Sequence, residues 1–381
     1  MRTEQRKWTE HDGWLPGLTS KIGTAAQLVL IFGSRKLFKG GKFLSDVRKI
    51  YPQAYLLGCS TAGEILKTEV SDNTIVTTAI QFEHSLVKTI KVNLDAVGGN
   101  SFEAGAFLGK SLGKDGLVHV LTISDGIRIN GSDLVRGLMA YLPKEVNITG
   151  GLAGDGSSFE ETLVLHNESA PEKGIVTVLG LYGHRLKVGY GSFGGWDPFG
   201  PERLVTRSSS NVLYELDGRS ALELYKEYLA DQASGLPATA LFFPLNVRNG
   251  QNGTPLVRTI LSIDEKEQSM TFAGDIPIRS YARLMKANTN RLIDGAASAA
   301  NMSLETIGNA SPDLAILISC VGRKLVLRQR VEEEIEAVSH VLGKNTALTG
   351  FYSYGELCPS LKGGICELHN QTMTITTLLE K

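Results

Sequence analysis

The stretch NTALTGFYSYGEL, residues 345–357, joins an apolar β-rich run to a turn that carries two glycines, three aromatic rings and a glutamate. Two earlier stretches follow the same plan, namely AYLLGCSTAGEI at 54–65 and NITGGLAGDGS at 147–157. A repeated segment determines an architecture more strongly than local propensity does. The chain is therefore predicted to contain three related units.

Each unit repeats the same order of elements around its glycine-rich turn. The units open with LVLIFGS (28–34), VHVLTISDG (118–126) and LAILISC (314–320), and they close with NTIVTTAIQF (73–82), GIVTVLGLYG (174–183) and TMTITTLLE (372–380). Amphipathic stretches lie between opening run and turn; in the third, Val331, Ile335, Val338 and Leu342 share one helical face. This order predicts an α/β fold in which repeated strand-helix-strand units form mixed sheets covered by helices.

The region between the second and third units differs from the rest. PLVRTILSI (255–263) and SMTFAGDI (269–276) have the composition of strands, and a long helix is predicted from Tyr281 to about Met302. The polar stretch LADQASGLPA (229–238) has the residues of a connection. We therefore expect two domains, 25–229 and 238–379.

Composition narrows the range of partners. The 39 Lys and Arg residues balance 40 Asp and Glu residues, so charge gives no indication of nucleic acid or an anionic lipid surface. No apolar stretch reaches the length of about 18 residues that a membrane-spanning helix needs. Four cysteines and a polar start, MRTEQRKWTEHDGW, fit neither a disulfide framework nor a signal peptide. A cytoplasmic protein is expected.

The glycine-rich turns are the predicted ligand site, because small molecules settle at the carboxyl ends of parallel strands where loops expose their backbone. Trp196, in GSFGGWDPFG (191–200), is a candidate wall of the same pocket together with the late tyrosines; the alternative is that the rings of this loop cover the end of the core. The alternative is that the glycines only permit positive φ or close packing. The turns contribute these candidate contacts: Cys59, Ser60, Thr61, Gly63, Glu64, Gly154, Asp155, Tyr352, Ser353, Tyr354, Gly355 and Glu356.

Several motifs together resemble one known family. LGCSTAGEI, GGLAGDG, GSFGGWDPFG followed by VLYELDGRSALELYKEYL, and TGFYSYGEL closing on ELHNQTMTITTL are similar to the FIST family, named for F-box and intracellular signal transduction proteins. The resemblance covers about 25–379 and includes both its N-terminal and C-terminal parts. It implies a small-ligand sensor, with amino acids among the proposed ligands.

Within that family the NosP proteins also have both halves and no fused output domain. The resemblance to them implies haem binding, nitric oxide sensing and a partner such as a histidine kinase or a cyclic-di-GMP enzyme. For an axial ligand we expect His369 or His184. His369 and Asn370 belong to a Leu-His-Asn sequence that also occurs at 165–167, and this repetition indicates first a structural role such as a hairpin turn. Asn370 also joins the predicted ligand contacts.

The sequence gives weaker indications of catalysis than of ligand sensing. Cys59 with Glu64 or Asp125 could form a hydrolase or transferase site, but no nucleophile motif, phosphate loop or dinucleotide fingerprint is present. Cys358 and Cys366 are not spaced as a zinc pair, although a redox-sensitive pair remains open. We therefore expect a non-enzymatic sensor, with the enzyme as the alternative.

Overall fold

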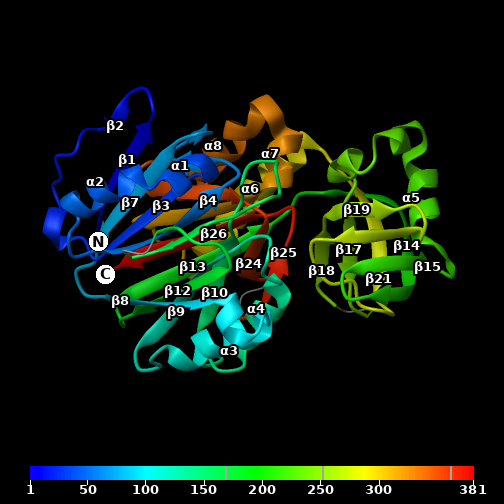
Figure 1. The fold of residues 1–381 in the computed structure, drawn as a ribbon, viewed down its shortest axis with the longest axis horizontal. Helices are drawn as coiled ribbons and strands as arrows, with labels where there is room; N and C mark the ends of the chain where they lie inside the picture. Colours follow the sequence, from blue (N-terminus) through cyan, green and yellow to red (C-terminus); the bar gives the residue numbers. More distant parts are fainter. Residues whose placement is uncertain (168–169, 251–252, 361–362) are drawn as a thin grey trace.

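The computed structural model describes residues 1–167, 170–250, 253–360 and 363–381. In this part of the chain the strands form three six-stranded sheets and one eight-stranded sheet. The three six-stranded sheets make up a body, and the eight-stranded sheet belongs to a small domain on one side of it (Figure 1). The predicted α/β fold with repeated units and mixed sheets is confirmed.

The body consists of the three predicted units. Unit one contains β1 (Arg2–Thr9), β2 (Gly13–Leu15), β3 (Leu28–Ser34), α1 (Arg35–Gly40), α2 (Lys42–Ile50), β4 (Tyr55–Thr61), β5 (Glu64–Leu66), β6 (Glu69–Ser71) and β7 (Ile75–Gln81). Unit two contains β8 (Leu86–Asn93), α3 (Ser101–Ser111), β9 (Leu117–Ser124), α4 (Gly131–Met139), β10 (Asn147–Leu152), β11 (Val164–His166) and β12 (Ile175–Tyr182). Unit three contains β13 (Leu186–Phe193), α6 (Thr289–Thr306), β22 (Leu314–Cys320), α7 (Val321–Leu327), α8 (Val331–Leu342), β23 (Ala347–Ser353), β24 (Gly355–Pro359), β25 (Cys366–His369) and β26 (Met373–Glu380).

The three sheets share the same central strand order, and each includes one or two strands from another unit. A parallel pair forms its centre: β3 with β4, β9 with β10, and β22 with β23. The strand after each glycine-rich turn leaves its own unit, so that β5 pairs with β23, β11 with β4 and β24 with β10. Because the three exchanges run in one direction, the units form a closed ring.

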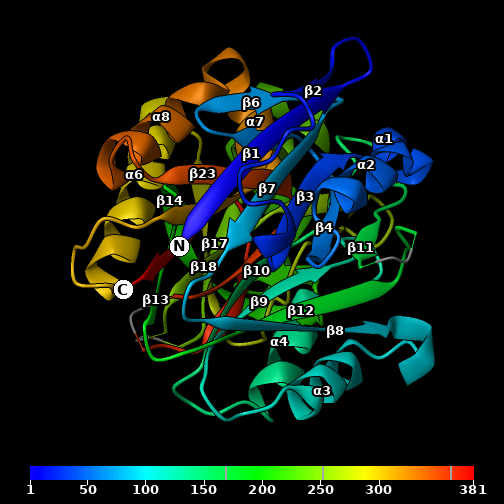
Figure 2. The ribbon, with the colours of Figure 1, turned by 90° about the vertical axis from the view of Figure 1, so that its left-hand side faces the viewer.

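The centre of the ring is an apolar core made by the inner faces of the three sheets. Strand runs such as LAILISC are buried along their whole length, as expected for strands covered on both faces. Phe32 of unit one and Phe351 of unit three meet there with ring centroids 4.7 Å apart. The helices cover the outer faces, with α1 and α2, α3 and α4, and α6 and α8 each packed on their own unit (Figure 2).

One glycine in each unit has a clear physical role in this arrangement. Gly58, Gly150 and Gly350 each lie opposite a residue of the neighbouring parallel strand. A Cβ atom at any of the three would overlap the backbone carbonyl of that neighbour. These glycines therefore allow the two strands to approach closely. Close packing was the alternative role that we considered for glycines in these segments.

The small domain is inserted into unit three, between β13 and α6. Its elements are β14 (Asp197–Ser209), β15 (Val212–Leu216), β16 (Arg219–Ser220), α5 (Ala221–Leu229), β17 (Leu245–Arg248), β18 (Pro255–Arg258), β19 (Ile260–Asp264), β20 (Ser269–Phe272) and β21 (Tyr281–Lys286). Short 3₁₀ turns at 230–235 and 238–242 follow α5. The domain has its own apolar core, which includes Phe272 and Tyr225.

The predicted helix from Tyr281 to Met302 is wrong in its first part. Residues 281–286 are strand β21, which pairs with both β14 and β17. Helix α6 begins at Thr289, where the side chain of Asn288 accepts a hydrogen bond from the amide of Arg291. The alternating burial of 281–286 fits a strand, and tertiary pairing there overrides the helical composition. The helix predicted over 331–342 is confirmed as α8.

Candidate functional site

The three glycine-rich turns meet at one end of the ring. The amide of Ala62 donates to the carbonyl of Tyr352 at 2.8 Å, and the amide of Gly154 donates to the carbonyl of Ser60 at 2.9 Å. The amide of Tyr354 donates to the carbonyl of Leu152 at 3.1 Å, which completes the contacts among the three units. The turns thus hold one another through backbone hydrogen bonds rather than leaving a space between them.

The two Gly-Glu turns have the same internal structure. Glu64 accepts hydrogen bonds from the Thr61 hydroxyl at 2.5 Å and from the Thr74 hydroxyl at 2.8 Å. Glu356 accepts from the Ser353 hydroxyl at 2.6 Å and from the Thr372 hydroxyl at 3.0 Å. Burial raises the pKa of Glu64 to about 7 and that of Glu356 to about 8. Through these hydrogen bonds Glu64 connects its turn to the start of β7, and Glu356 connects its turn to the start of β26.

The two late tyrosines point to different parts of the molecule. Tyr352 is fully buried, and its hydroxyl donates to Glu334 at 2.6 Å, beside the buried ion pair of Glu334 with Arg323. The Tyr354 hydroxyl donates to Asp155, and its ring stacks on Phe159 with centroids 4.3 Å apart. Only the second of these tyrosines faces a cavity.

A cavity of about 780 Å³ lies where units two and three meet the small domain. The body contributes the loop 126–131 after β9, Leu152 and Phe159 near β10, residues 320–322 after β22, and Tyr354. The small domain contributes Asn211 and residues 235–238, 241, 259–261 and 272–275. The body side of the cavity is thus built at the carboxyl ends of parallel strands. The ligand site expected among the glycine-rich turns stays a prediction.

The lining of this larger cavity is mostly apolar, with a few polar groups. The hydroxyl of Thr259 is buried and has no hydrogen-bond partner among the described residues. The Asn211 amide nitrogen donates to the carbonyl of Phe272 at 2.7 Å, and burial raises the pKa of the Cys320 thiol. Apolar walls with few polar groups are typical of sites for small organic molecules.

All the predicted contacts other than Tyr354 lie outside the described lining of this cavity. Asp155 bonds to Arg35 at 2.8 Å and to the amides of Glu160 and Glu161. The Trp196 indole donates to the carbonyl of Gln371 at 2.8 Å. Among the described lining residues Tyr354 is present, and these predicted contacts are not: Cys59, Ser60, Thr61, Gly63, Glu64, Gly154, Asp155, Trp196, Tyr352, Ser353, Gly355, Glu356 and Asn370.

Neither candidate haem ligand is among the described residues that line the two larger cavities. His184 is exposed in the turn between β12 and β13. His369 is buried, its Nε2 lies 2.9 Å from the carbonyl oxygen of Cys358, and burial lowers its pKa to about 4. The lining residues of the two larger cavities include no histidine in the described chain. These residues do not fit a haem held through His369 or His184.

The Leu-His-Asn repeat has the turn geometry that its repetition indicates, although not identically in the two copies. Asn167 has a φ of 56°, whereas in the third unit it is Gln371, one residue after Asn370, that has a positive φ of 61°. The Asn370 amide nitrogen donates to the carbonyl of His369 at 3.0 Å. In the third unit the left-handed residue lets the chain turn from β25 into β26.

Thiol and metal chemistry receive little support. Cys59, Cys320, Cys358 and Cys366 are all free and buried, and burial raises the pKa of the Cys59 thiol well above its ordinary value. A thiol with a raised pKa is a poor nucleophile. In the described residues, no group of three or more His, Cys, Asp or Glu is placed to hold a metal ion. Those residues also form no helix with the length and apolar character needed to cross a bilayer.

Two models of known protein families match this chain. The model of the FIST N domain matches residues 27–219, and the model of the FIST C domain matches residues 221–359. The boundary between the two matches falls inside the small domain, before α5. The expected division into 25–229 and 238–379 stays a prediction.

Individual relatives are distant. An uncharacterized protein of Methanocaldococcus jannaschii, MJ1623, is 21% identical over 83% of this chain, and the chain spans 64% of its length. Among solved structures, a chorismatase has 10% identity and a TM-score of 0.34 over 99% of this chain and 98% of its own. A cyanuric acid hydrolase from A. caulinodans has 11% identity and a TM-score of 0.17, and the match covers 78% of this chain and 99% of the hydrolase chain. Likenesses this weak indicate no activity.

Proposed function

Since the chain belongs to the FIST family, whose domains are associated with signal transduction and small-ligand sensing, we propose that it is a sensor whose ligand binds in the larger cavity. The observation that supports this proposal most is the position of the cavity. Its volume of about 780 Å³ is within the usual range for small-molecule sites, and it lies at the carboxyl ends of β9, β10 and β22.

The lining suggests the chemistry of the ligand. Ile127, Leu241 and Phe272 represent a mostly apolar wall, and the stacked rings of Phe159 and Tyr354 offer a flat surface at one side. The unpaired hydroxyl of Thr259 would gain a hydrogen bond from a single polar group on the ligand. We therefore favour a small, largely apolar molecule with one or two polar groups.

The arrangement of the walls suggests how binding changes the protein. The ligand would contact the body through the loop 126–131 and the small domain through residues 259–261 and 272–275. A ligand that touches both parts stabilises the arrangement in which they are close. The position of the small domain relative to the body is then the signal that a partner protein reads.

A cavity-filling substitution tests this proposal. Ala273 lines the larger cavity and is half-buried, so Ala273→Trp places an indole in the ligand space. Ala25→Trp, at an exposed position in unit one, is the matched control. A panel of amino acids and other small metabolites is screened by thermal shift on the wild-type protein, and any stabilising compound is then measured on both variants.

The expected result is that Ala273→Trp loses the stabilisation and Ala25→Trp retains it. Circular dichroism shows whether each variant is folded. Full stabilisation of a folded Ala273→Trp protein would place the ligand elsewhere and overturn the proposal.

The finer expectation of haem-dependent nitric oxide sensing is a separate matter. It rests on the resemblance to NosP proteins, and the positions of His369 and His184 do not support it. A haem-reconstituted sample tests it directly, because a Soret band that shifts with nitric oxide would establish a haem site. A partner histidine kinase or cyclic-di-GMP enzyme is likewise a proposal, to be tested by co-purification with such enzymes from the same genome.

A further inference from the structure

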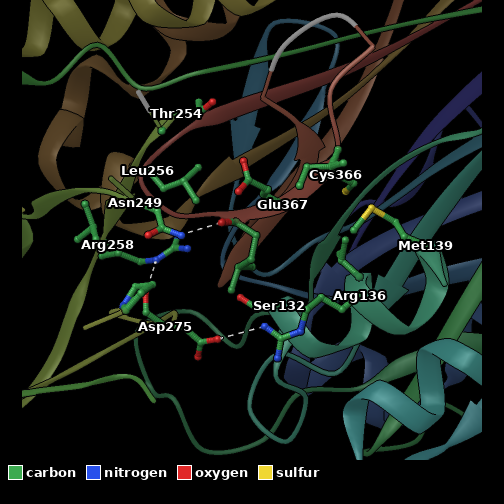
Figure 3. A pocket seen from close by; sticks show the side chains of 16 residues that line it. Ser132, Arg136, Met139, Asn249, Thr254, Leu256, Arg258, Asp275, Cys366 and Glu367 are labelled. Atoms are coloured by element: carbon green, nitrogen blue, oxygen red, sulfur yellow. Dashed lines mark hydrogen bonds and ion pairs between the residues drawn. The ribbon is translucent and has the colours of Figure 1, made fainter. Parts of the chain in front are cut away.

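A second cavity, of about 470 Å³, lies between the small domain and the body on the other side of Asp275 (Figure 3). Helix α4 contributes Ser132 and Arg136 to its lining, and strand β25 contributes Glu367. The small domain contributes Asn249, Thr254, Arg258 and Asp275. Asp275 also lines the larger cavity, so the two cavities share one wall.

Arg258 is the unusual residue of this smaller cavity. It ends β18, and only 5% of its surface is exposed. Its Nη1 donates to the carbonyl of Leu368 at 2.9 Å and its Nε donates to the carbonyl of Asp275 at 3.2 Å. No carboxylate of the described residues lies within 4.0 Å of its guanidinium, in contrast to the buried Arg323, which pairs with Glu334 at 2.8 Å.

The remaining nitrogen of Arg258 is available to a ligand. Nη2 has no hydrogen-bond partner among the described residues, and it is not one of the fully enclosed polar atoms of the structure. Figure 3 shows the guanidinium among the lining side chains, with Asp275 between it and Arg136. Arg258 thus lines the cavity, and its Nη2 has no acceptor among the described residues.

The two carboxylates near Arg258 make polar contacts with other residues, although Asp275 Oδ1 is buried and has no hydrogen-bond partner among the described residues. Asp275 Oδ2 lies 3.6 Å from Arg136 Nη1, and Arg136 also pairs with Asp133. Glu367 accepts a hydrogen bond from the Ser360 hydroxyl at 2.6 Å. Both carboxylates attract the Arg258 charge only at longer range, while burial lowers the pKa of its guanidinium to about 10. The buried cation is hydrogen-bonded, but its charge has no direct partner.

A purely structural role for Arg258 accounts for part of this geometry. By bonding to Leu368 of the body and to Asp275 of its own domain, Arg258 ties the small domain to β25. That role uses Nη1 and Nε and requires no charge, because carbonyl acceptors would serve a neutral donor as well. This structural role does not explain why Nη2 is left without a partner. It also does not explain why a cation is buried, at a cost in free energy, without a counter-charge.

We infer that the smaller cavity is a binding site for a small organic or inorganic anion, in which a carboxylate or phosphate group accepts hydrogen bonds from Nη2 of Arg258. Nε and Nη1 are already hydrogen-bonded to backbone carbonyls, so the oxyanion is held by charge-assisted hydrogen bonds from Nη2 alone. Asn249 and Thr254 on the small domain and Ser132 on α4 supply further polar groups around the same space. The bound anion joins the small domain to the body at a place separate from the larger cavity.

The test measures the binding of two probes, malonate and inorganic phosphate, by isothermal titration calorimetry at constant ionic strength. The wild-type protein is expected to bind at least one of them saturably, and comparison of the two tells whether carboxylate or phosphate is preferred. Arg258→Gln should weaken binding at least about tenfold, since it removes a charged donor. Arg219→Gln, which removes an exposed arginine of the same domain, should leave binding unchanged.

A second variant covers the case in which Arg258→Gln does not fold. Ser132→Phe leaves Arg258 in place and fills the cavity from the α4 side, so it should abolish binding of the same probe. Binding that is unchanged in Ser132→Phe or in a folded Arg258→Gln would overturn the inference. The absence of saturable binding of both probes to the wild-type protein would overturn it as well.

Discussion

Replacing Glu356 by glutamine should change how the stability of this protein depends on pH. The Glu356 carboxyl is completely buried and accepts hydrogen bonds from the Ser353 and Thr372 hydroxyls. Burial raises its pKa from the ordinary 4.5 to about 8, because the charged form loses its hydration there. Glutamine has nearly the same shape but cannot ionise; its one carbonyl oxygen can accept from the Thr372 groups, while its NH2 group can donate to the Ser353 hydroxyl.

The sign and size of the effect follow from proton linkage. The unfolded chain releases this proton near pH 4.5, whereas the folded chain keeps it up to about pH 8. Between these values unfolding releases a proton, so the free energy of unfolding falls as pH rises. One such carboxyl contributes a loss of about 1 kcal/mol per pH unit across this window. Below about pH 4.5 the carboxyl is protonated in both the folded and the unfolded chain, so it causes no loss of stability there.

The assay is urea unfolding of wild type and Glu356→Gln at a series of pH values between about 5 and 8. The difference in unfolding free energy between the two proteins should shift in favour of the variant by about 1 kcal/mol for each unit of increasing pH. Glu223→Gln, at an exposed position in α5, is the control and should show no such trend. Parallel pH profiles for wild type and Glu356→Gln would refute the reasoning.

Two further substitutions test the packing of unit three by chemical denaturation. Gly350→Ala should lower the free energy of unfolding by about 2 kcal/mol or more, because the new Cβ overlaps a backbone carbonyl of the neighbouring strand. The control Gly113→Ala has open space for its Cβ and should leave the free energy of unfolding nearly unchanged. Arg323→Met should cost about 3–5 kcal/mol by leaving Glu334 buried without its partner, against at most about 1 kcal/mol for the exposed Arg330→Met. Equal losses within either pair would contradict these assignments.

The repeated units could be predicted from the sequence because their signals are local. The run LAILISC at 314–320 is apolar throughout, and the glycine at the same place in each unit marks the close approach of two strands. The helix at 331–342 shows its buried face in the spacing of its apolar residues. Such features depend on neighbours a few residues away in the chain.

The exchange of strands between units could not be predicted in this way. Strand β5, Glu64–Leu66, is only three residues long, and nothing in its composition says that it pairs with Phe351 and its neighbours nearly 300 residues later. Pairing partners are chosen by the assembled sheets rather than by the segment itself. The closed ring is therefore a property of the tertiary structure.

The candidate site was only partly accessible to sequence reasoning for the same reason. Tyr352 and Tyr354 were expected in one wall, but β23 ends at Ser353, and the turn that follows directs Tyr354 alone to the larger cavity. The opposite wall comes from the inserted small domain, including Thr259, which no local motif marks. Arg258 did leave a signal, as a charged residue within the apolar run PLVRTILSI, but its burial and missing counter-charge appear only in the structure.

The most direct test of ligand sensing in the larger cavity is hydrogen–deuterium exchange of the whole chain, with and without a compound that stabilises the wild-type protein. Binding between the body and the small domain predicts slower exchange in the loop 126–131 and in residues 235–238, 241, 259–261 and 272–275, which line that cavity. Slower exchange confined to α1 and α2 of unit one, with these segments unchanged, would contradict it.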